Sequence, residues 1–395
     1  MSLTVRHGLM LGTWWKISAR EFSTVRQETL AAKVAKYAAK RPNPVNIQSW
    51  MSEFGQPKQL AEFLCHEMPI RYAERIRCIE TISEWRHVEE LAAVHDIQLN
   101  AFETFSQQQR TQWEDASQFK AMVEDVQLED RRTKFLLMQA AQKLRAQRQS
   151  DSFTDPFSLE LNKFLDDFLL SRLGCNMLMG QYLACTTSRS SIVNPQCDAF
   201  EICQKAADEV KRRCRNSQGR VPLLNVRAFT MSGQMATEGH VPRFSYIPGI
   251  LMHVVRELLK NSCQASLELA KSEAELEDMP IDVIVCADKQ HVVIRITDCA
   301  RGIPRHVGSK IWSYLYSGSP TAMTGLSFGY GIGLPLSRLH ARYLGGSLDL
   351  VSLPGYGVDA YLSLPRVETD LVETIPDNVE QDATEVSQQI NLLTL

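Results

Sequence analysis

Three short segments in the second half of the chain carry residue types that could bind a phosphorylated nucleotide and move a proton. In the first, His253, Glu257 and Asn261 recur at every fourth residue, so on a helix they share one face. An imidazole can orient a neighbouring carboxylate that acts as a general base, and an amide oxygen is an acceptable ligand for magnesium. Polar helix stripes are more often simply solvated, so this segment alone is weak evidence of a site.

The second and third segments supply one acidic residue and a set of glycines. Asp298 ends a strand-like run before a loop that contains Gly302, where its carboxylate could accept a hydrogen bond from an exocyclic amine such as that of adenine. Gly329, Gly331 and Gly333 alternate just before a helical run, so backbone N–H groups and the helix N-terminus could hold phosphate there. Neither the dinucleotide fingerprint nor the Walker loop fits, because no parallel βαβ unit and no Gly-Lys-Ser/Thr sequence accompanies them.

The spacing of apolar residues divides the chain into a helical part and a mixed part. Residues 21–215 show apolar residues at three- to four-residue spacing, which predicts a bundle of four long helices. Residues 216–366 alternate β-rich runs with helices, which predicts an α+β domain. The tail 367–395 has seven acidic residues and no Lys or Arg, so we expect it to be loosely held.

The individual elements follow from the same periodicities and from the glycines and prolines between them. In the first part, we expect helices at 27–40, 47–54, 59–97, 109–148 and 157–184. In the second part, we expect helices at 247–269 and 334–343, and strands at 221–229, 280–286, 291–297, 347–352 and 359–364.

Composition limits the class of protein. The 395 residues are 44% hydrophobic and 23% charged with a net charge of −3, which is typical of a globular protein of two or three domains and excludes a strongly basic nucleic-acid coat. We therefore expect no nucleic-acid partner. The ten cysteines form no Cys-x-x-Cys pair and no zinc-like spacing, which indicates reduced, mostly buried thiols. No apolar run reaches about 18 residues, so we expect no membrane insertion.

The first twenty residues have an unusual composition. Residues 1–20 contain three basic residues, no acidic residue and several large apolar side chains. This composition is similar to that of a mitochondrial transit peptide.

The order and gaps of the three segments resemble the N, G1 and G2 boxes of the Bergerat ATP-binding fold, which histidine kinases, Hsp90, gyrase and MutL share. Residues 328–364, beginning Phe-Gly-Tyr-Gly-Ile-Gly-Leu-Pro-Leu-Ser-Arg, resemble the mitochondrial pyruvate dehydrogenase kinases and branched-chain ketoacid dehydrogenase kinases. Residues 63–73, Phe-Leu-Cys-His-Glu-Met-Pro-Ile-Arg-Tyr-Ala, are similar to that family's Phe-Leu-x-x-Glu-Leu-Pro-Val-Arg-Leu-Ala, and residues 165–181 and 246–248 match as well. The resemblance covers about residues 27–366 and implies a four-helix bundle followed by a Bergerat-type α/β sandwich.

The resemblance implies a protein serine kinase that uses ATP and Mg²⁺ to phosphorylate and inactivate the E1α subunit of a mitochondrial 2-oxo acid dehydrogenase complex. Glu257 would be the general base, His253 would support it, and Asn261 would bind magnesium. The ATP-binding residues would be Glu257, Lys260, Asn261, Gln264, Asp298, Gly302, Ser317, Gly318, Phe328, Gly329, Tyr330, Gly331, Ile332, Gly333 and Leu334. The helical bundle would dock the lipoyl domain of E2, and a homodimer would form through the β-rich domain. The location would be the mitochondrial matrix; pyruvate and branched-chain complexes both remain possible.

Four positions depart from the family pattern. Tyr182 replaces a histidine of the fourth bundle helix, which argues against a phosphohistidine relay through this position. Ala300 replaces the first glycine of the G1 box, and its methyl group is tolerated unless the position needs a positive φ. Gln264 replaces an arginine of the N box, and Val358 replaces a threonine near the adenine.

Three alternative functions stay open, and Ala300, Gln264 and Val358 motivate the first of them. The first is a noncatalytic, ATP-binding regulator of a dehydrogenase complex. The second is a histidine-kinase-type protein kinase, which needs a phosphoacceptor histidine such as His66 or His87, each close to a glutamate. The third is a helical interaction protein with an incidental glycine-rich loop.

Overall fold

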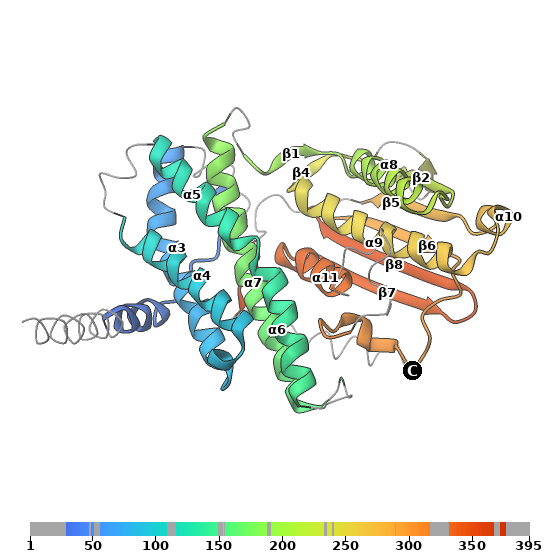
Figure 1. Cartoon of the computed structure of the whole chain (residues 1–395). Coiled ribbons are helices and arrows are strands. Elements are labelled where there is room, and N and C mark those ends of the chain that lie inside the picture. The colour runs from blue at the N-terminus through green and yellow to red at the C-terminus, as the bar shows by residue number, and fades with distance from the viewer. Residues whose placement is uncertain are drawn as a thin grey trace, which may run out of the picture.

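The computed structural model describes two regions that lie side by side (Figure 1). The described residues are 29–46, 49–50, 56–108, 116–148, 153, 155–187, 191–232, 235–238, 241–288, 290–316, 332–366 and 372–376. We refer to 29–187 as the helical region and to 191–366 as the sheet region. The transit-like segment 1–20 and most of the acidic tail lie outside the described residues, as do Ser317, Gly318, Phe328, Gly329, Tyr330 and Gly331.

Five helices with bounds given by the structure pack together in the helical region, and residues 29–38 are helical as well. The five are α3 (Pro57–Glu80), α4 (Glu89–Ser106), α5 (Ala116–Asp130), α6 (Thr133–Gln147) and α7 (Pro156–Cys185). Helix α7 is the longest and packs against α3, α5 and α6. Its start is fixed locally, because Pro156 suits a first helical position and the Asp155 carboxylate accepts a hydrogen bond from the Ser158 N–H at 3.0 Å.

Two stretches that the sequence predicts as single helices are each divided in the structure. The stretch 59–97 is interrupted after Glu80, and the 3₁₀ turn η2 (Trp85–His87) leads into α4. The stretch 109–148 is divided at Arg131 and Arg132, between α5 and α6. Apolar residues keep their three- to four-residue spacing on both sides of each break. The spacing is therefore the same whether one helix continues or a turn joins two helices.

The sheet region contains a six-stranded mixed sheet. Its strands, in spatial order, are β3 (Met235–Glu238), β2 (Leu224–Ser232), β5 (Ile281–Ala287), β6 (His291–Asp298), β8 (Gly357–Pro365) and β7 (Ser347–Leu353). Strands β2 and β5 are parallel, and every other neighbouring pair is antiparallel. The two predicted strand pairs are confirmed as the neighbours β5–β6 and β7–β8.

Three helices cover one face of this sheet: α8 (Ala199–Gln218), α9 (Pro248–Leu269) and α11 (Gly333–Tyr343). Ile281, Val283 and Val285 of β5 are fully buried at alternate positions, as expected of a strand with one face against helices. The remaining elements are the short helix α10 (Glu273–Glu277) and the pair formed by β1 (Asn194–Cys197) and β4 (Phe244–Tyr246). The predicted mixture of helices and a sheet is therefore confirmed. Helix α8, which precedes the predicted boundary at 216, packs against α9 and β2.

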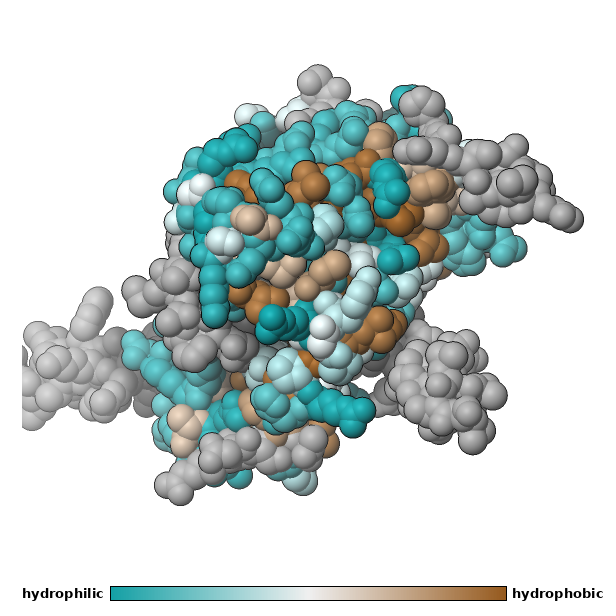
Figure 2. All heavy atoms as spheres, turned by 90° about the vertical axis from the view of Figure 1, so that its right-hand side faces the viewer, coloured by the Kyte–Doolittle hydropathy of each residue, from teal (hydrophilic) through white to brown (hydrophobic). Residues whose placement is uncertain are grey.

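The other face of the sheet has no described helix over it. Its side chains include Ile284, Val293 and Tyr361, which are half-buried, and Val351 and Leu353 of the edge strand β7, which are exposed. The end of the molecule formed by the sheet region is mainly hydrophilic, with separate hydrophobic patches (Figure 2). Among the described residues, no helix is both long and apolar enough to cross a lipid bilayer.

The tail contains one correction to the sequence analysis. Residues 372–376 are not loosely held: Val372 pairs with Asn46, and the Glu373 side chain is 1% exposed. The acidic composition of the tail concealed this, because the partner of Glu373 is Arg71, 302 positions away in the sequence. The ten cysteines, all within the described residues, are free thiols as expected.

Candidate functional site

A cavity of about 510 Å³ lies between helix α9, the sheet and the start of α11. Seven of the residues predicted to bind ATP line it: Lys260, Asn261, Gln264, Asp298, Gly302, Gly333 and Leu334. They come from three segments that are up to 74 positions apart in the sequence, at α9, after β6 and at α11. The fold therefore brings together the three segments that the sequence analysis singled out. Of the other predicted residues, Ile332 is buried just before α11, and the roles of all of them remain predictions.

Asp298 occupies the end of the central strand β6, inside the cavity. Its side chain is only 5% exposed and accepts hydrogen bonds from the Ser262 hydroxyl at 3.0 Å and the Ala300 N–H at 3.1 Å. Burial raises the pKa of Asp298, and these hydrogen bonds oppose that rise. A buried carboxylate at the base of a cavity is suited to accept a hydrogen bond from a ligand amine.

The loop after Asp298 explains why Ala300 is tolerated. The residues with positive φ in this loop are Arg301 at 61° and Gly302 at 75°, and Ala300 is not among them. The condition under which its methyl group would be harmful is therefore not met. Gly357, opposite this loop, cannot be replaced in the same way, because a Cβ there would clash with the Asp298 carbonyl oxygen.

Glu257 lies beside the cavity, at the N-terminus of α11. Its carboxylate forms an ion pair with Lys260, and both side chains are about one-sixth exposed, at 15% and 17%. A Cβ at Gly333 would lie 2.8 Å from Glu257 Oε2, so the absence of a side chain at this glycine is what admits the carboxylate. The carboxylate, the ammonium group and the first turn of α11 thus meet at one end of the cavity, an arrangement suited to phosphate chemistry.

His253 contacts another histidine instead of Glu257. Its ring packs against that of His340 on α11, with the centroids 4.5 Å apart, and the His253 Nε2 has no hydrogen-bond partner among the described residues. The Nδ1 of His340 lies 2.7 Å from the Leu336 carbonyl oxygen and donates to it. Burial, reinforced by neighbouring cations, lowers the pKa of His253 to about 4, and burial lowers that of His340 to about 3. Both rings are therefore neutral at physiological pH. The support predicted for Glu257 from His253 is not a direct hydrogen bond.

Several residues of the cavity were missed by the sequence analysis. Ser262 donates a hydrogen bond to Asp298 and follows Asn261 on α9. Its place directly after the predicted metal ligand is the one feature of the sequence that could have indicated its role. Tyr316 lines the cavity just before Ser317. Leu350 and Ile311 gave no signal, because apolar residues at these positions are indistinguishable from ordinary core.

The segment that leads to residue 317 is fastened to the helical region. The Asn162 side-chain oxygen accepts hydrogen bonds from the Ser313 hydroxyl at 3.0 Å and the Tyr314 N–H at 2.9 Å. The Tyr314 hydroxyl donates to Asp166 at 2.6 Å, and the Arg145 guanidinium donates to the Leu315 carbonyl at 3.2 Å. Helices α6 and α7 thus hold one wall of the cavity, although they belong to the other region of the molecule.

Two family models match the chain, one after the other. A model described as mitochondrial branched-chain alpha-ketoacid dehydrogenase kinase matches residues 28–210. A model described as histidine kinase-, DNA gyrase B-, and HSP90-like ATPase matches residues 247–368, which include α9, Asp298 and α11.

Similar curated proteins agree with these models. The mitochondrial pyruvate dehydrogenase (acetyl-transferring) kinase isozyme 4 of Ictidomys tridecemlineatus is 33% identical over 228 residues, 55% of this chain and 54% of the relative. The mitochondrial pyruvate dehydrogenase kinase of Schizosaccharomyces pombe is 32% identical over 233 residues, 54% of this chain and 52% of the relative. That of Arabidopsis thaliana is 28% identical over 380 residues, 88% of this chain and 97% of the relative.

The chain spans about half the length of the first two of these relatives and nearly the whole length of the third. The first family model covers the helical region and continues into α8, and the second covers the larger part of the sheet region, in the order that the resemblance predicts. The chain is therefore similar, in both of its regions, to the mitochondrial pyruvate dehydrogenase kinases and branched-chain ketoacid dehydrogenase kinases, whose ATPase part is of the GHKL type.

Proposed function

We propose that this protein is an ATP-dependent protein serine kinase of a mitochondrial 2-oxo acid dehydrogenase complex, which it inactivates by phosphorylating E1α. The observation that carries the proposal is the cavity in which Asn261, Asp298 and Gly333 converge, with the Glu257 carboxylate against Gly333. The names of the similar proteins, which are pyruvate dehydrogenase kinases, support the same activity.

In this proposal, the two ends of the cavity bind the two ends of ATP. The Asp298 carboxylate would accept a hydrogen bond from the adenine amine, since it is buried and held in place by Ser262. The phosphates would lie at the first turn of α11, beside Gly333 and the Lys260 ammonium group. Glu257 would then take the proton of the substrate serine hydroxyl as the serine oxygen forms a bond to the γ-phosphorus. The bond between the γ-phosphorus and ADP breaks in the same transfer, and ADP leaves with its electron pair.

The residues present also fit a magnesium ion. Asn261 lines the cavity one helical turn from Glu257, and its amide makes no hydrogen bond with any other described residue. Magnesium is usually held by one or two protein oxygens together with phosphates and water, so a single amide is an adequate protein contribution. When bound, the ion would neutralise charge on the phosphates during transfer.

Direct transfer to serine agrees better with the structure than a histidine relay does. Tyr182, at the family's histidine position, is 1% exposed and packs edge-on against Phe119 at 5.0 Å. His66 lies at a helix surface with its Nδ1 2.8 Å from the Glu62 carbonyl oxygen. Its neighbour Glu67 is buried in an ion pair with Arg71, which indicates a structural role for this His-Glu pair.

The partners and the location belong to the same proposal. E1α would be the substrate, and the helical region would dock the lipoyl domain of E2, in the mitochondrial matrix. A homodimer would form through the sheet face that no described helix covers, which presents Val351 and Leu353 to solvent. Whether the complex oxidises pyruvate or branched-chain 2-oxo acids is decided by the experiment below.

The test is transfer of labelled phosphate from Mg-ATP to purified pyruvate and branched-chain E1α, with the wild type beside Glu257→Gln and Tyr182→Phe. We expect transfer to one E1α, lost in Glu257→Gln because the amide cannot accept a proton, and retained in Tyr182→Phe because only a core hydroxyl is removed. The E1α that is labelled identifies the substrate complex.

Two results would redirect the proposal. ATP binding without transfer to either E1α would indicate a noncatalytic regulator, in which Gln264 and Val358 are the departures to explain. Acid-labile label on the protein itself would indicate a histidine kinase.

A further inference from the structure

The C-terminal strap, residues 372–376, joins the helical region to the sheet region. We propose that Glu373 in this strap is a positioning residue: it fixes helix α11 and thereby holds Gly333 and Glu257 in the geometry that the nucleotide site requires. The proposal rests on the proposed function only in naming ATP as the ligand.

The strap makes backbone contacts on both of its sides. Toward the helical region, Val372 pairs with Asn46, and the Glu373 N–H donates to the Val45 carbonyl at 2.9 Å. Toward the sheet region, the Thr374 N–H donates to the Tyr343 carbonyl at 2.9 Å, and the Thr374 hydroxyl donates to the Arg342 carbonyl at 2.9 Å. Tyr343 is the last residue of α11, so the Thr374 N–H satisfies a carbonyl group that the end of the helix leaves without an intrahelical partner.

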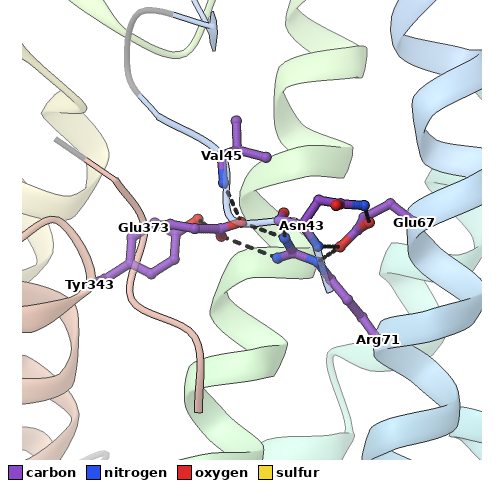
Figure 3. Close-up of polar contacts among 6 residues, drawn as sticks. All are labelled: Asn43, Val45, Glu67, Arg71, Tyr343 and Glu373. Atoms are coloured by element: carbon purple, nitrogen blue, oxygen red, sulfur yellow. Dashed lines mark hydrogen bonds and ion pairs between the residues drawn. The ribbon is translucent and has the colours of Figure 1, made fainter. Parts of the chain in front are cut away.

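The Glu373 side chain is the anchor of the strap (Figure 3). Its carboxylate accepts hydrogen bonds from the Val45 N–H at 3.0 Å and the Tyr343 hydroxyl at 2.8 Å, and it forms an ion pair with Arg71 through both terminal guanidinium nitrogens. The Arg71 Nε donates to Glu67 at 2.9 Å, and Glu67 also accepts from the Asn43 N–H and side-chain amide. Tyr343 is the member of this cluster that belongs to α11.

The cluster is buried, so its charges depend on one another. Glu67, Arg71 and Glu373 are each at most 2% exposed. Burial alone would lower the pKa of Arg71, but the adjacent carboxylates of Glu373 and Glu67 outweigh it, so the pKa lies above its ordinary value. Replacing Glu373 by glutamine leaves the Arg71–Glu67 ion pair, but one of the two acceptor oxygens becomes an NH₂ group that cannot accept a hydrogen bond from Arg71 or Tyr343, so the surrounding groups must move to accommodate it.

The cluster is tightly packed on the side of α7. Gly174 of α7 lies directly beside the ion pair, and a Cβ at this glycine would be 2.6 Å from Arg71 Nη1 and 3.0 Å from Glu373 Oε2. The alanine variant of this glycine would therefore push the pair apart without changing any charge. It is an independent way to disturb the same contact.

Helix α11 carries the effect from the strap to the cavity. It has 11 residues, so its two ends are about 16 Å apart. Tyr343 is fixed by the strap at one end, and Gly333 lies against the Glu257 carboxylate at the other. Between them, His340 packs against His253 of α9. A shift of the Tyr343 end of α11 therefore disturbs both contacts that α11 makes here with α9, the helix that carries Glu257 and Asn261.

The test compares the full-length wild type with Glu373→Gln and Gly174→Ala. Glu277→Gln, at an exposed glutamate of α10, is the matched control. Two quantities are measured well below the melting temperature of every variant: the Kd for a fluorescent ATP analogue with Mg²⁺, and the hydrogen-exchange rates of α11 amides relative to those of α4. We expect both test variants to raise the Kd at least fivefold and to accelerate exchange in α11 more than in α4, and the control to stay within twofold of the wild type.

The outcomes separate a positioning role from a merely structural one. A lower melting temperature with Kd and α11 exchange within twofold of the wild type, in both test variants, would overturn the inference, because Glu373 would then stabilise the fold without positioning the site. If the wild type binds no nucleotide, the proposed function fails, and the exchange rates of α11 alone decide the positioning role. An effect of Glu373→Gln that Gly174→Ala does not reproduce would also count against it, because the two variants disturb one contact.

Discussion

Replacing Gly333 by alanine is expected to slow phosphoryl transfer while leaving the fold intact. The new Cβ would lie 2.8 Å from Glu257 Oε2, whereas ordinary contacts begin near 3.4 Å, so the carboxylate must move by about 0.6 Å. Misplacing a catalytic group by 1 Å can lower a rate by about 10²-fold, so we expect kcat to fall about tenfold. Gly333 lies at the start of α11 with no positive φ, so the free energy of unfolding should stay within about 1 kcal/mol of the wild type.

The assay measures kcat for labelled phosphate transfer to E1α, together with urea unfolding. Gly249→Ala is the matched control, because Gly249 lies in the first turn of α9 and a Cβ there meets no atom within 4 Å. In a Glu257→Gln background, the alanine at 333 should not lower any residual transfer further, since both changes act on the same carboxylate. A kcat within twofold of the wild type in the single variant would refute this account of the contact.

Three further predictions follow from buried groups. Asp298→Asn should weaken nucleotide binding at least tenfold by titration, yet not lower the melting temperature, because burial raises the pKa of Asp298 and its charged form therefore costs stability at neutral pH. The unfolding free energy should fall as the pH drops from about 6.5 toward 4, since the folded state keeps His253 and His340 neutral while the unfolded state binds protons. His253 contributes up to roughly 3 kcal/mol, and urea unfolding of His253→Gln at pH 5 and 7 should show a smaller pH dependence. Finally, a thiol reagent should label the five buried cysteines only after denaturation. These are Cys175, Cys197, Cys203, Cys214 and Cys263, and their modification in the native protein, detected by mass spectrometry, would contradict their burial.

The helical region illustrates what local patterns cannot supply. Periodicity located helices throughout this region, but it merged α3 with α4 and α5 with α6. The turns at 81–88 and 131–132 preserve the apolar spacing on either side, so only the packing of neighbouring helices distinguishes a turn from a continuation. Strand β3 and the parallel pairing of β2 with β5 were likewise not predicted, because register depends on residues distant in the sequence.

The site divides in the same way. The residue types of Asn261, Asp298 and Gly333 indicated their chemistry, and the fold brings all three to one cavity. The ion pair of Glu257 with Lys260 is a local contact three residues apart on one helix. The contact between the His253 and His340 rings links two helices that are 87 positions apart at these residues, and no local pattern indicated it.

By itself, then, the sequence determined the helical and mixed halves of the chain, the order of the three segments proposed to bind nucleotide and the family resemblance, because these depend on residue type and short-range spacing. Tertiary structure alone decided that Glu373 of an acidic tail is buried against Arg71, and that Asn162 of a helix holds a wall of the cavity. The physical reason is that a charged or polar side chain is stable in the interior only when a partner satisfies it, and those partners are brought close by folding rather than by the sequence.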